Sequence, residues 1–320
     1  MLDKFLDPKN DTAFKKIFGN EKNHDILIHF LNDVLVFQEK HPISKITLLK
    51  TILDPEIAAK KTSILDILCE DDKGSKYIVE IHLAKTSGFE KRAQYYASKA
   101  YCSQANVGDQ YENLKEVIFL AIADYVMFPD KKKYKSDHVI LDKETYEQDL
   151  KDFSFTFIEL PKFNKTIEEL TTLEEKWYYF FKHAGDTSPE DLKRLTGKDE
   201  IIERVYQELD HHYWSKEELL GYERAEKAKN DYISSLKQKF SEGFGEGLDK
   251  GKAEERAKAE KEKAEERARV EKERAEERAK VEEEKVLSLK NIARDLRDQG
   301  VPVSLIHLTT KLSIKEIEDL

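Results

Sequence analysis

Two short apolar runs, each holding one acidic residue, most constrain what this chain can fold into. The first run is Ser-Ile-Leu-Asp66-Ile-Leu-Cys and the second is Tyr-Ile-Val-Glu80-Ile-His82-Leu. Residues 70–75, Glu-Asp-Asp-Lys-Gly-Ser, link them with a turn-rich segment. Runs rich in isoleucine, leucine and valine on either side of such a link predict an antiparallel β-hairpin. We therefore expect Asp66 to lie mid-strand, opposite the second strand and within reach of Glu80.

The acidic residues of this hairpin point to a metal site or to a buried ion pair. Glu80 and His82 share one face of their strand, because side chains alternate along a strand. A charge inside an apolar strand is costly unless it is paired or bound to a metal. Carboxylate oxygens from two strands suit Mg²⁺ or Mn²⁺. The alternative is a salt bridge, for which the candidate partners are Lys60, Lys61, Lys85 and Arg92. The spacing alone leaves both open.

The residues around the hairpin resemble those of the recombination-promoting nuclease (Rpn)/transposase family, within the PD-(D/E)xK nucleases. The matching blocks keep the order of the family and cover roughly the first 130 residues, so that together they are specific. They are Asp11-Thr-Ala-Phe14-Lys15-Lys16-Ile-Phe18-Gly19, Phe30-Leu31-Asn32, Ile64-Leu65-Asp66-Ile67, Val79-Glu80-Ile81 and Phe89-Glu-Lys-Arg92-Ala-Gln-Tyr95-Tyr96-Ala-Ser98-Lys99.

This resemblance implies a restriction-endonuclease-like α/β fold and a metal-dependent DNA endonuclease. Asp66, Glu80 and the backbone carbonyl of Ile81 would bind the metal. The position two residues after the glutamate is Lys in the broader fold and commonly Gln in Rpn-like proteins, whereas this chain has His82. We expect His82 to position or deprotonate water with a pKa near neutrality, or to bind the metal itself. The alternative is a degraded site that still binds DNA.

Other candidate residues lie on the two expected helices that flank the hairpin. Asp11 is an acidic contributor by resemblance, but an aspartate there is also a good helix N-cap, and the sequence favours the cap. Arg92 either steadies a phosphate or pairs with Glu80. The tyrosine at 96 lines a DNA groove or packs in the helix, and packing is the commoner role. The candidate DNA-binding residues are Lys15, Lys16, Arg92, Tyr96 and Lys99.

Hydrophobic periodicity predicts the elements of the core in the order α-β-β-β-α-β. The first helix spans residues 9–36, and Phe89 to Val107 is a second helix. The run from Glu116 to Tyr125 is continuously apolar, as in a central buried strand. The remaining predicted strands are 43–53, 61–69, 76–83, 137–141 and 153–159.

The chain divides into a nuclease core and a series of helical segments. We expect the core over 1–165, a helical subdomain over 166–240, a glycine-rich hinge over 241–252, a charged repeat over 253–285 and a helical pair over 286–320. The repeat has an eleven-residue period, which can support a right-handed coiled coil. Its apolar stripe is almost only alanine, so a solvated charged helix is favoured. The final pair has a helix-turn-helix look, but packing on a partner is favoured over DNA reading.

Composition limits the compartment and the partners. Charged residues are 38% of the chain and the formal charge is −10, so phosphate contacts need a local basic groove. Two cysteines and an N-terminus without a signal-peptide core predict a reducing cytoplasm, and no apolar run is long enough for a membrane span. The pair His211-His212 lacks the cysteine or acidic spacing of a convincing zinc site, and no nucleotide cofactor is expected.

Two functional hypotheses follow. The first is a Mg²⁺-dependent DNA endonuclease, which the resemblance associates with DNA recombination, mobile elements or phage defence. The second is a scaffold in which a weak or inactive nuclease core binds DNA while the C-terminal helices recruit a protein partner or a second copy. Nuclease cores often pair to cut both strands, so a homodimer is expected in either case.

Overall fold

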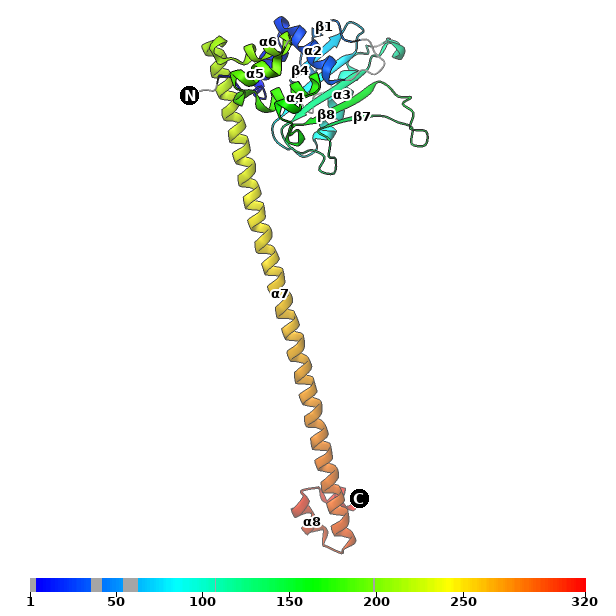
Figure 1. Cartoon of the computed structure of the whole chain (residues 1–320). Helices are drawn as coiled ribbons and strands as arrows, with labels where there is room; N and C mark the ends of the chain where they lie inside the picture. Colours follow the sequence, from blue (N-terminus) through cyan, green and yellow to red (C-terminus); the bar gives the residue numbers. More distant parts are fainter. Residues whose placement is uncertain (1–3, 36–41, 54–62, 107, 198) are drawn as a thin grey trace. The chain divides into compact units, whose positions relative to one another are not determined.

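A mixed β-sheet carries the acidic hairpin. The computed structural model describes residues 4–35, 42–53, 63–106, 108–197 and 199–320. The sheet consists of β1 (Ile46–Leu48), β4 (Ile67–Asp71), β5 (Lys76–His82), β6 (Val117–Ala123), β7 (Lys135–Val139) and β8 (Phe153–Glu159). Its strands have the order β1-β4-β5-β6-β8-β7 (Figure 1). A separate short sheet pairs β2 (Ile52–Leu53) with β3 (Ser63–Ile64).

The predicted hairpin and the predicted central strand are confirmed. β4 and β5 pair antiparallel, and the turn between them uses Gly74 at φ 88°, a backbone conformation that suits glycine. β6 pairs parallel with both β5 and β8, and all seven of its residues are buried. A strand covered on both faces reads as a continuous apolar run, which is why the sequence identified it.

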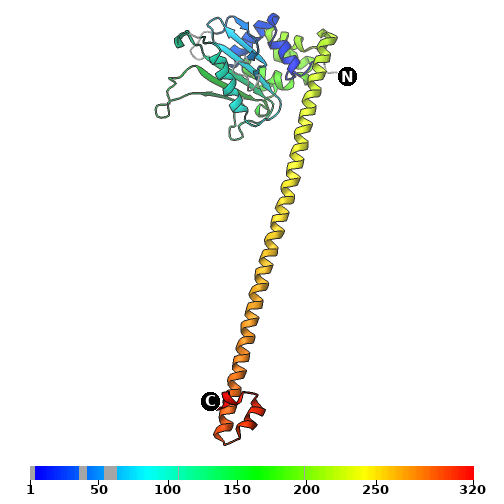
Figure 2. The ribbon, with the colours of Figure 1, turned by 180° about the vertical axis from the view of Figure 1, so that it is seen from behind.

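Helices cover both faces of the sheet (Figures 1 and 2). On one face lie α1 (Asp11–Phe18), α2 (His24–Val34), α4 (Leu173–His183) and α6 (Glu200–Leu209), and on the other lies α3 (Phe89–Cys102). Successive strand residues alternate between the two cores: Val79 contributes to the first and Ile78 to the second. The order helix, strands, helix, strand is the predicted α-β-β-β-α-β core.

The predicted helix over 9–36 is in fact two helices. α1 ends at Phe18, where the N–H of the cap residue Gly19 donates to the Lys15 carbonyl. A short 3-10 turn, η1 (Glu21–Asn23), follows, with the side chain of Asn20 as its cap, and leads into α2. Helical periodicity continues across the break because both helices bury the same kind of face. The Gly19-Asn20 pair marks the end of the first helix in the sequence, but the continuous hydrophobic periodicity hides this break.

The segment after the sheet is helical, as predicted, but it shares the apolar core that covers one face of the sheet. It comprises α4, α5 (Pro189–Thr196), α6 and the beginning of α7 (Lys216–Asp298), together with short 3-10 turns that include η7 (His211–Tyr213). Trp177 and Phe181 of α4 are fully buried against Phe18 and Phe30. These aromatic contacts make α4 part of the same apolar cluster as α1 and α2.

The chain separates into two compact units, residues 1–235 and 236–320. In the second unit, α8 (Val303–Thr310) and α9 (Ile314–Glu318) pack on the end of α7 around Ala293, Ile306 and Ile317. Residues 241–252 are helical, whereas an interruption was expected, so the four glycines in this stretch do not end the helix. Hinge motion there stays a prediction. Within the described ranges, no helix has the length and apolarity that a membrane span requires.

Candidate active site

The β4–β5 pairing brings Asp66 and Glu80 together. Ile67 pairs with Val79, so the next position places Asp66 opposite Glu80. The amide of Asp66 donates to Glu80 Oε1 at 3.1 Å, and the amide of Ile81 donates to Asp66 Oδ2 at 2.9 Å. Each side chain is thus held by the backbone of the opposite strand. Asp66 does not lie mid-strand as expected: it occupies a bend immediately before β4.

The two carboxylates compete for ionisation. Burial and, after it, the neighbouring charge of Asp66 raise the pKa of Glu80 to about 8. Burial likewise raises the pKa of Asp66. Like charges in a shared, poorly solvated site cannot both ionise without a compensating cation. Without a metal, the pair therefore retains a proton at neutral pH.

The start of α1 adds charges to this site. Asn10 is the N-cap of α1, accepting the amide of Thr12, so the prediction that Asp11 is the cap is wrong. Asp11 instead forms an ion pair with Lys15 at 2.7 Å, one helical turn later. The charge of Asp11 raises the pKa of Asp66, and that of Lys15 lowers the pKa of both carboxylates. The cap that the sequence assigned to Asp11 is supplied by its neighbour.

Arg92 supplies a further positive charge from α3. It lowers the pKa of both carboxylates, although the burial of these groups has the larger effect. Its guanidinium lies 5.0 Å from the ring centroid of Phe89 and 5.8 Å from that of Tyr96. Its Nε is buried and has no hydrogen-bond partner among the described residues. Arg92 is therefore close enough to affect the charge of both carboxylates. Its Nε–H can still donate a hydrogen bond to a ligand.

The salt-bridge alternative is not what the described structure contains. Neither Asp66 nor Glu80 has an ion pair within 4.0 Å to any described lysine or arginine, including Lys85 and Arg92. The other two candidate partners, at positions 60 and 61, lie outside the described residues. An acidic pair with raised pKa values and no described ion-pair partner favours the metal-site interpretation.

His82 is a half-buried, neutral histidine. Its ring lies 4.0 Å from that of Phe89 and 6.5 Å from that of Tyr125. Burial and the charge of Arg92 lower the pKa of His82 to about 4, so the expected value near neutrality is corrected. Among the described residues, a group of three side chains from histidine and acidic residues has ligand atoms that all lie within 4.8 Å of one another. His82 is not part of this group. Its aromatic packing supports a role beside the site more than one as a metal ligand.

The remaining candidates separate into two sets. Tyr96 is half-buried, and the charges of Glu80 and Asp66 raise its pKa, after burial as the main cause, so it borders the site. Lys99, on the same helix, lies 5.2 Å from the Tyr95 ring centroid. Lys16 instead pairs with Glu218 and lies 4.9 Å from the Trp214 ring centroid, in a packing role. The structure therefore does not bring Lys16 to the carboxylates.

Tyr125 borders the site although the sequence did not single it out. It follows the end of β6, and its ring stands edge-on to that of His82. Its hydroxyl is buried without a partner among the described residues, and burial raises the pKa of Tyr125 to about 12. Parallel pairing of β5 and β6 is what carries it there. No local signal in the sequence predicts the position of Tyr125. The apolar run identifies β6 as a strand, but it does not show that β6 pairs with β5.

Comparison with known proteins gives one match. The family model described as PD-(D/E)XK nuclease family transposase matches residues 8–239. No curated protein and no solved structure matches the chain. The matched region contains α1, the acidic hairpin, α3 and the helices that complete the core. The chain therefore belongs to the PD-(D/E)XK nuclease family transposases.

Proposed function

We propose that this protein is a Mg²⁺- or Mn²⁺-dependent DNA endonuclease with its active site at Asp66 and Glu80. The observation that supports this most directly is the pairing of the buried Glu80 carboxylate with the partly buried Asp66 carboxylate, whose pKa values are both raised. Comparison of DNA cleavage by the wild type and by variants of these two residues, in Mg²⁺ and in Mn²⁺, tests the proposal. Roles in DNA recombination, mobile elements or phage defence, and a cytoplasmic location, belong to the same proposal.

The chemistry of these donors fits a hard divalent cation. Both side chains offer oxygen, and the backbone carbonyl of Ile81 is the proposed third ligand. A cation would relieve the repulsion that keeps a proton on the pair. When bound, such an ion polarises the scissile phosphate and acidifies a water molecule. The amide hydrogen bonds from Asp66 and Ile81 hold the two carboxylates in place before any cation binds.

The positive groups around the pair are suited to a phosphate backbone. Lys15 reaches the site from α1 and Arg92 from α3, and both act on the two carboxylates. The Nε of Arg92, which has no hydrogen-bond partner among the described residues, can donate to a phosphate oxygen. Tyr96 and Lys99, also on α3, extend this side. We propose that the strand to be cut passes between α1 and α3, across the open end of the hairpin.

His82 is proposed to hold the attacking water as a neutral hydrogen-bond acceptor. With its pKa lowered to about 4, it carries no charge at the pH of the cell. Glutamine can accept the same hydrogen bond without titrating. We therefore expect His82→Gln to keep cleavage within about tenfold of wild type, whereas His82→Ala loses about a hundredfold or more.

The pH dependence of the same variants separates a neutral His82 from a titrating one. The rates of wild type and His82→Gln, measured from pH 6 to 9, should rise with the same profile. A wild-type inflection at the ordinary pKa of histidine that disappears in His82→Gln would show that His82 titrates there. Such a result contradicts the neutral role.

The second unit supports a second function, self-association or the binding of a protein partner, which is compatible with nuclease activity in the first unit. It has its own small core, and it exposes large apolar side chains on α8 and α9, among them Leu305, Leu308 and Ile314. Exposed apolar side chains grouped on one small unit are typical of an interaction surface. We propose a homodimer or a protein partner at these helices, which is also what a scaffold with a weak active site would use.

Deleting residues 241–320 should lower the oligomeric mass or remove a bound partner. The cores around the sheet lie entirely before residue 235, so folding of the first unit should survive. Light scattering coupled to size exclusion, with pull-down of bound proteins, measures the effect. A mass per chain and a set of partners identical to those of the full chain would contradict the interaction role.

A further inference from the structure

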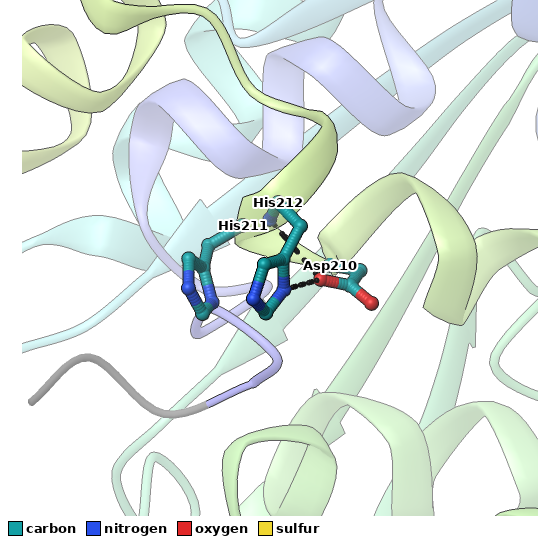
Figure 3. Close-up of side chains that lie close together, drawn as sticks. All are labelled: Asp210, His211 and His212. Atoms are coloured by element: carbon teal, nitrogen blue, oxygen red, sulfur yellow. Dashed lines mark hydrogen bonds and ion pairs between the residues drawn. The ribbon is translucent and has the colours of Figure 1, made fainter.

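A second group of ligand side chains lies outside the carboxylate site. Asp210, His211 and His212 occupy the corner between α6 and α7, in and just before the 3-10 turn η7 (Figure 3). One carboxylate oxygen and one nitrogen from each ring all lie within 4.8 Å of one another. From the sequence, no zinc site was expected here, because no acidic partner stood at a suitable spacing. The acidic partner is the adjacent residue, and the turn folds it back toward the rings.

Hydrogen bonds fix the tautomer of both histidines. His212 Nδ1 lies 2.7 Å from Asp210 Oδ1, and His211 Nδ1 lies 3.1 Å from the carbonyl oxygen of Lys4. A carbonyl oxygen accepts only, and so does an ionised carboxylate, so both Nδ1 atoms must carry the proton and donate it. The lone pair of each neutral ring then resides on Nε2. Histidines that bind metals characteristically donate their other N–H to a carboxylate or a backbone carbonyl.

The carboxylate is rigidly placed. Asp210 is 8% exposed, and its carboxylate caps η7 by accepting a hydrogen bond from the amide of His212. Its backbone forms an isolated antiparallel β-bridge with Phe5 of the N-terminal segment. The anchor of the His212 ring is thus part of the folded framework.

The two rings lie close together, tilted against each other, and that of His212 is exposed. Their centroids lie 4.1 Å apart at an interplanar angle of 31°, and Figure 3 shows them side by side. The His212 side chain is 68% exposed. The pair can therefore receive a ligand from solvent without any change in the backbone. Imidazole nitrogens prefer Zn²⁺ and related transition metals over Mg²⁺.

We propose that His211 and His212 bind a divalent transition metal such as Zn²⁺ through their Nε2 atoms, with Asp210 orienting His212 and water completing the coordination. This site is separate from the carboxylate pair and does not depend on nuclease activity. It joins the N-terminal segment at Lys4 and Phe5 to the corner that begins α7. A bound metal would stabilise the packing of that segment against this corner.

Isothermal titration of the full chain with Zn²⁺ tests this site. The chain should carry Asp66→Asn and Glu80→Gln, so that the carboxylate site cannot contribute. We expect one equivalent of Zn²⁺ to bind and millimolar Mg²⁺ not to displace it. Adding His211→Gln or His212→Gln should weaken binding at least tenfold, and Asp210→Asn about tenfold to a hundredfold through loss of orientation. A Zn²⁺ excess of about a hundredfold over Kd should raise the melting temperature by roughly 5 °C.

His307 provides a matched control. Its Nδ1 also faces a backbone carbonyl, that of Leu312 at 2.6 Å, but it belongs to no described ligand group. His307→Gln should leave the stoichiometry and affinity unchanged. His212→Gln alters a mostly exposed ring, so it should remain folded, and circular dichroism verifies this. The proposal is overturned if the parent chain binds no stoichiometric Zn²⁺, if Mg²⁺ competes equally, or if binding survives in the folded His211→Gln/His212→Gln chain.

Discussion

Asp66→Asn and Glu80→Gln are each expected to lower metal-dependent DNA cleavage by at least about a hundredfold. Substitution of groups that only orient a metal ligand costs tenfold to a hundredfold, so loss of a proposed ligand should cost no less. Asparagine and glutamine keep the size of the side chain, and their carbonyl oxygens can still accept the amide hydrogen bonds that hold both residues. The fold should therefore persist while the anionic donors disappear.

Conversion of supercoiled plasmid to nicked and linear forms, in Mg²⁺ and separately in Mn²⁺, measures this effect. Glu112→Gln is a suitable control, because this exposed glutamate lies on the short 3-10 turn Tyr111–Asn113 and is not among the charges that act on Asp66 or Glu80, so its loss should not change the rate. Every variant is purified by the same procedure, so that a contaminating nuclease appears in all of them. If the double variant nicks DNA as fast as the wild type in both metals, the enzyme interpretation is lost.

Glu80→Gln is also expected to stabilise the metal-free protein at alkaline pH. Burial, with a further contribution from Asp66, raises the pKa of Glu80 from an ordinary value of 4.5 to about 8. Between these values the folded state binds more protons than the unfolded state, so stability must fall as pH rises. The loss through this window is on the order of 5 kcal/mol. Glutamine is neutral in both states and removes that slope.

Urea unfolding in EDTA, at intervals from pH 5 to 9, measures the free energy of unfolding against pH. Glu175→Gln is an informative control because Glu175 is also buried. Burial opposes its ionisation, but hydrogen bonds from Lys165 and Thr171 lower the pKa of Glu175 to about 2. Its replacement should destabilise the protein throughout this range. If wild type and Glu80→Gln show the same pH slope, Glu80 does not hold a proton in the metal-free fold.

The same proton links pH to metal binding. A cation between the carboxylates must displace it, so the affinity for Mg²⁺ should increase with pH until about 8 and then level off. Binding should release protons to the buffer below that pH. These effects belong to the carboxylate pair, because His82 is already neutral across the whole range.

Local sequence patterns predicted secondary structure well in segments whose burial pattern is uniform along their length. The β4–β5 hairpin follows from two apolar runs and a turn, and β6 from a run buried on both faces. The break between α1 and α2 was missed because both helices bury the same kind of face and the periodicity continues across Gly19. The cap at Asn10 was missed for a similar reason: Asn10 and Asp11 are both good caps, and only the backbone conformation distinguishes them.

The sequence by itself determined the hairpin, its two acidic residues and the family that they identify. The tertiary structure decided which charges surround that pair: Asp11 and Lys15 arrive from α1, Arg92 from α3, and Lys16 pairs elsewhere with Glu218. It also decided that His82 is neutral, since Phe89 and the charge of Arg92 come to it from another element. A pKa depends on desolvation and on nearby charge, and both are properties of segments that meet only after folding.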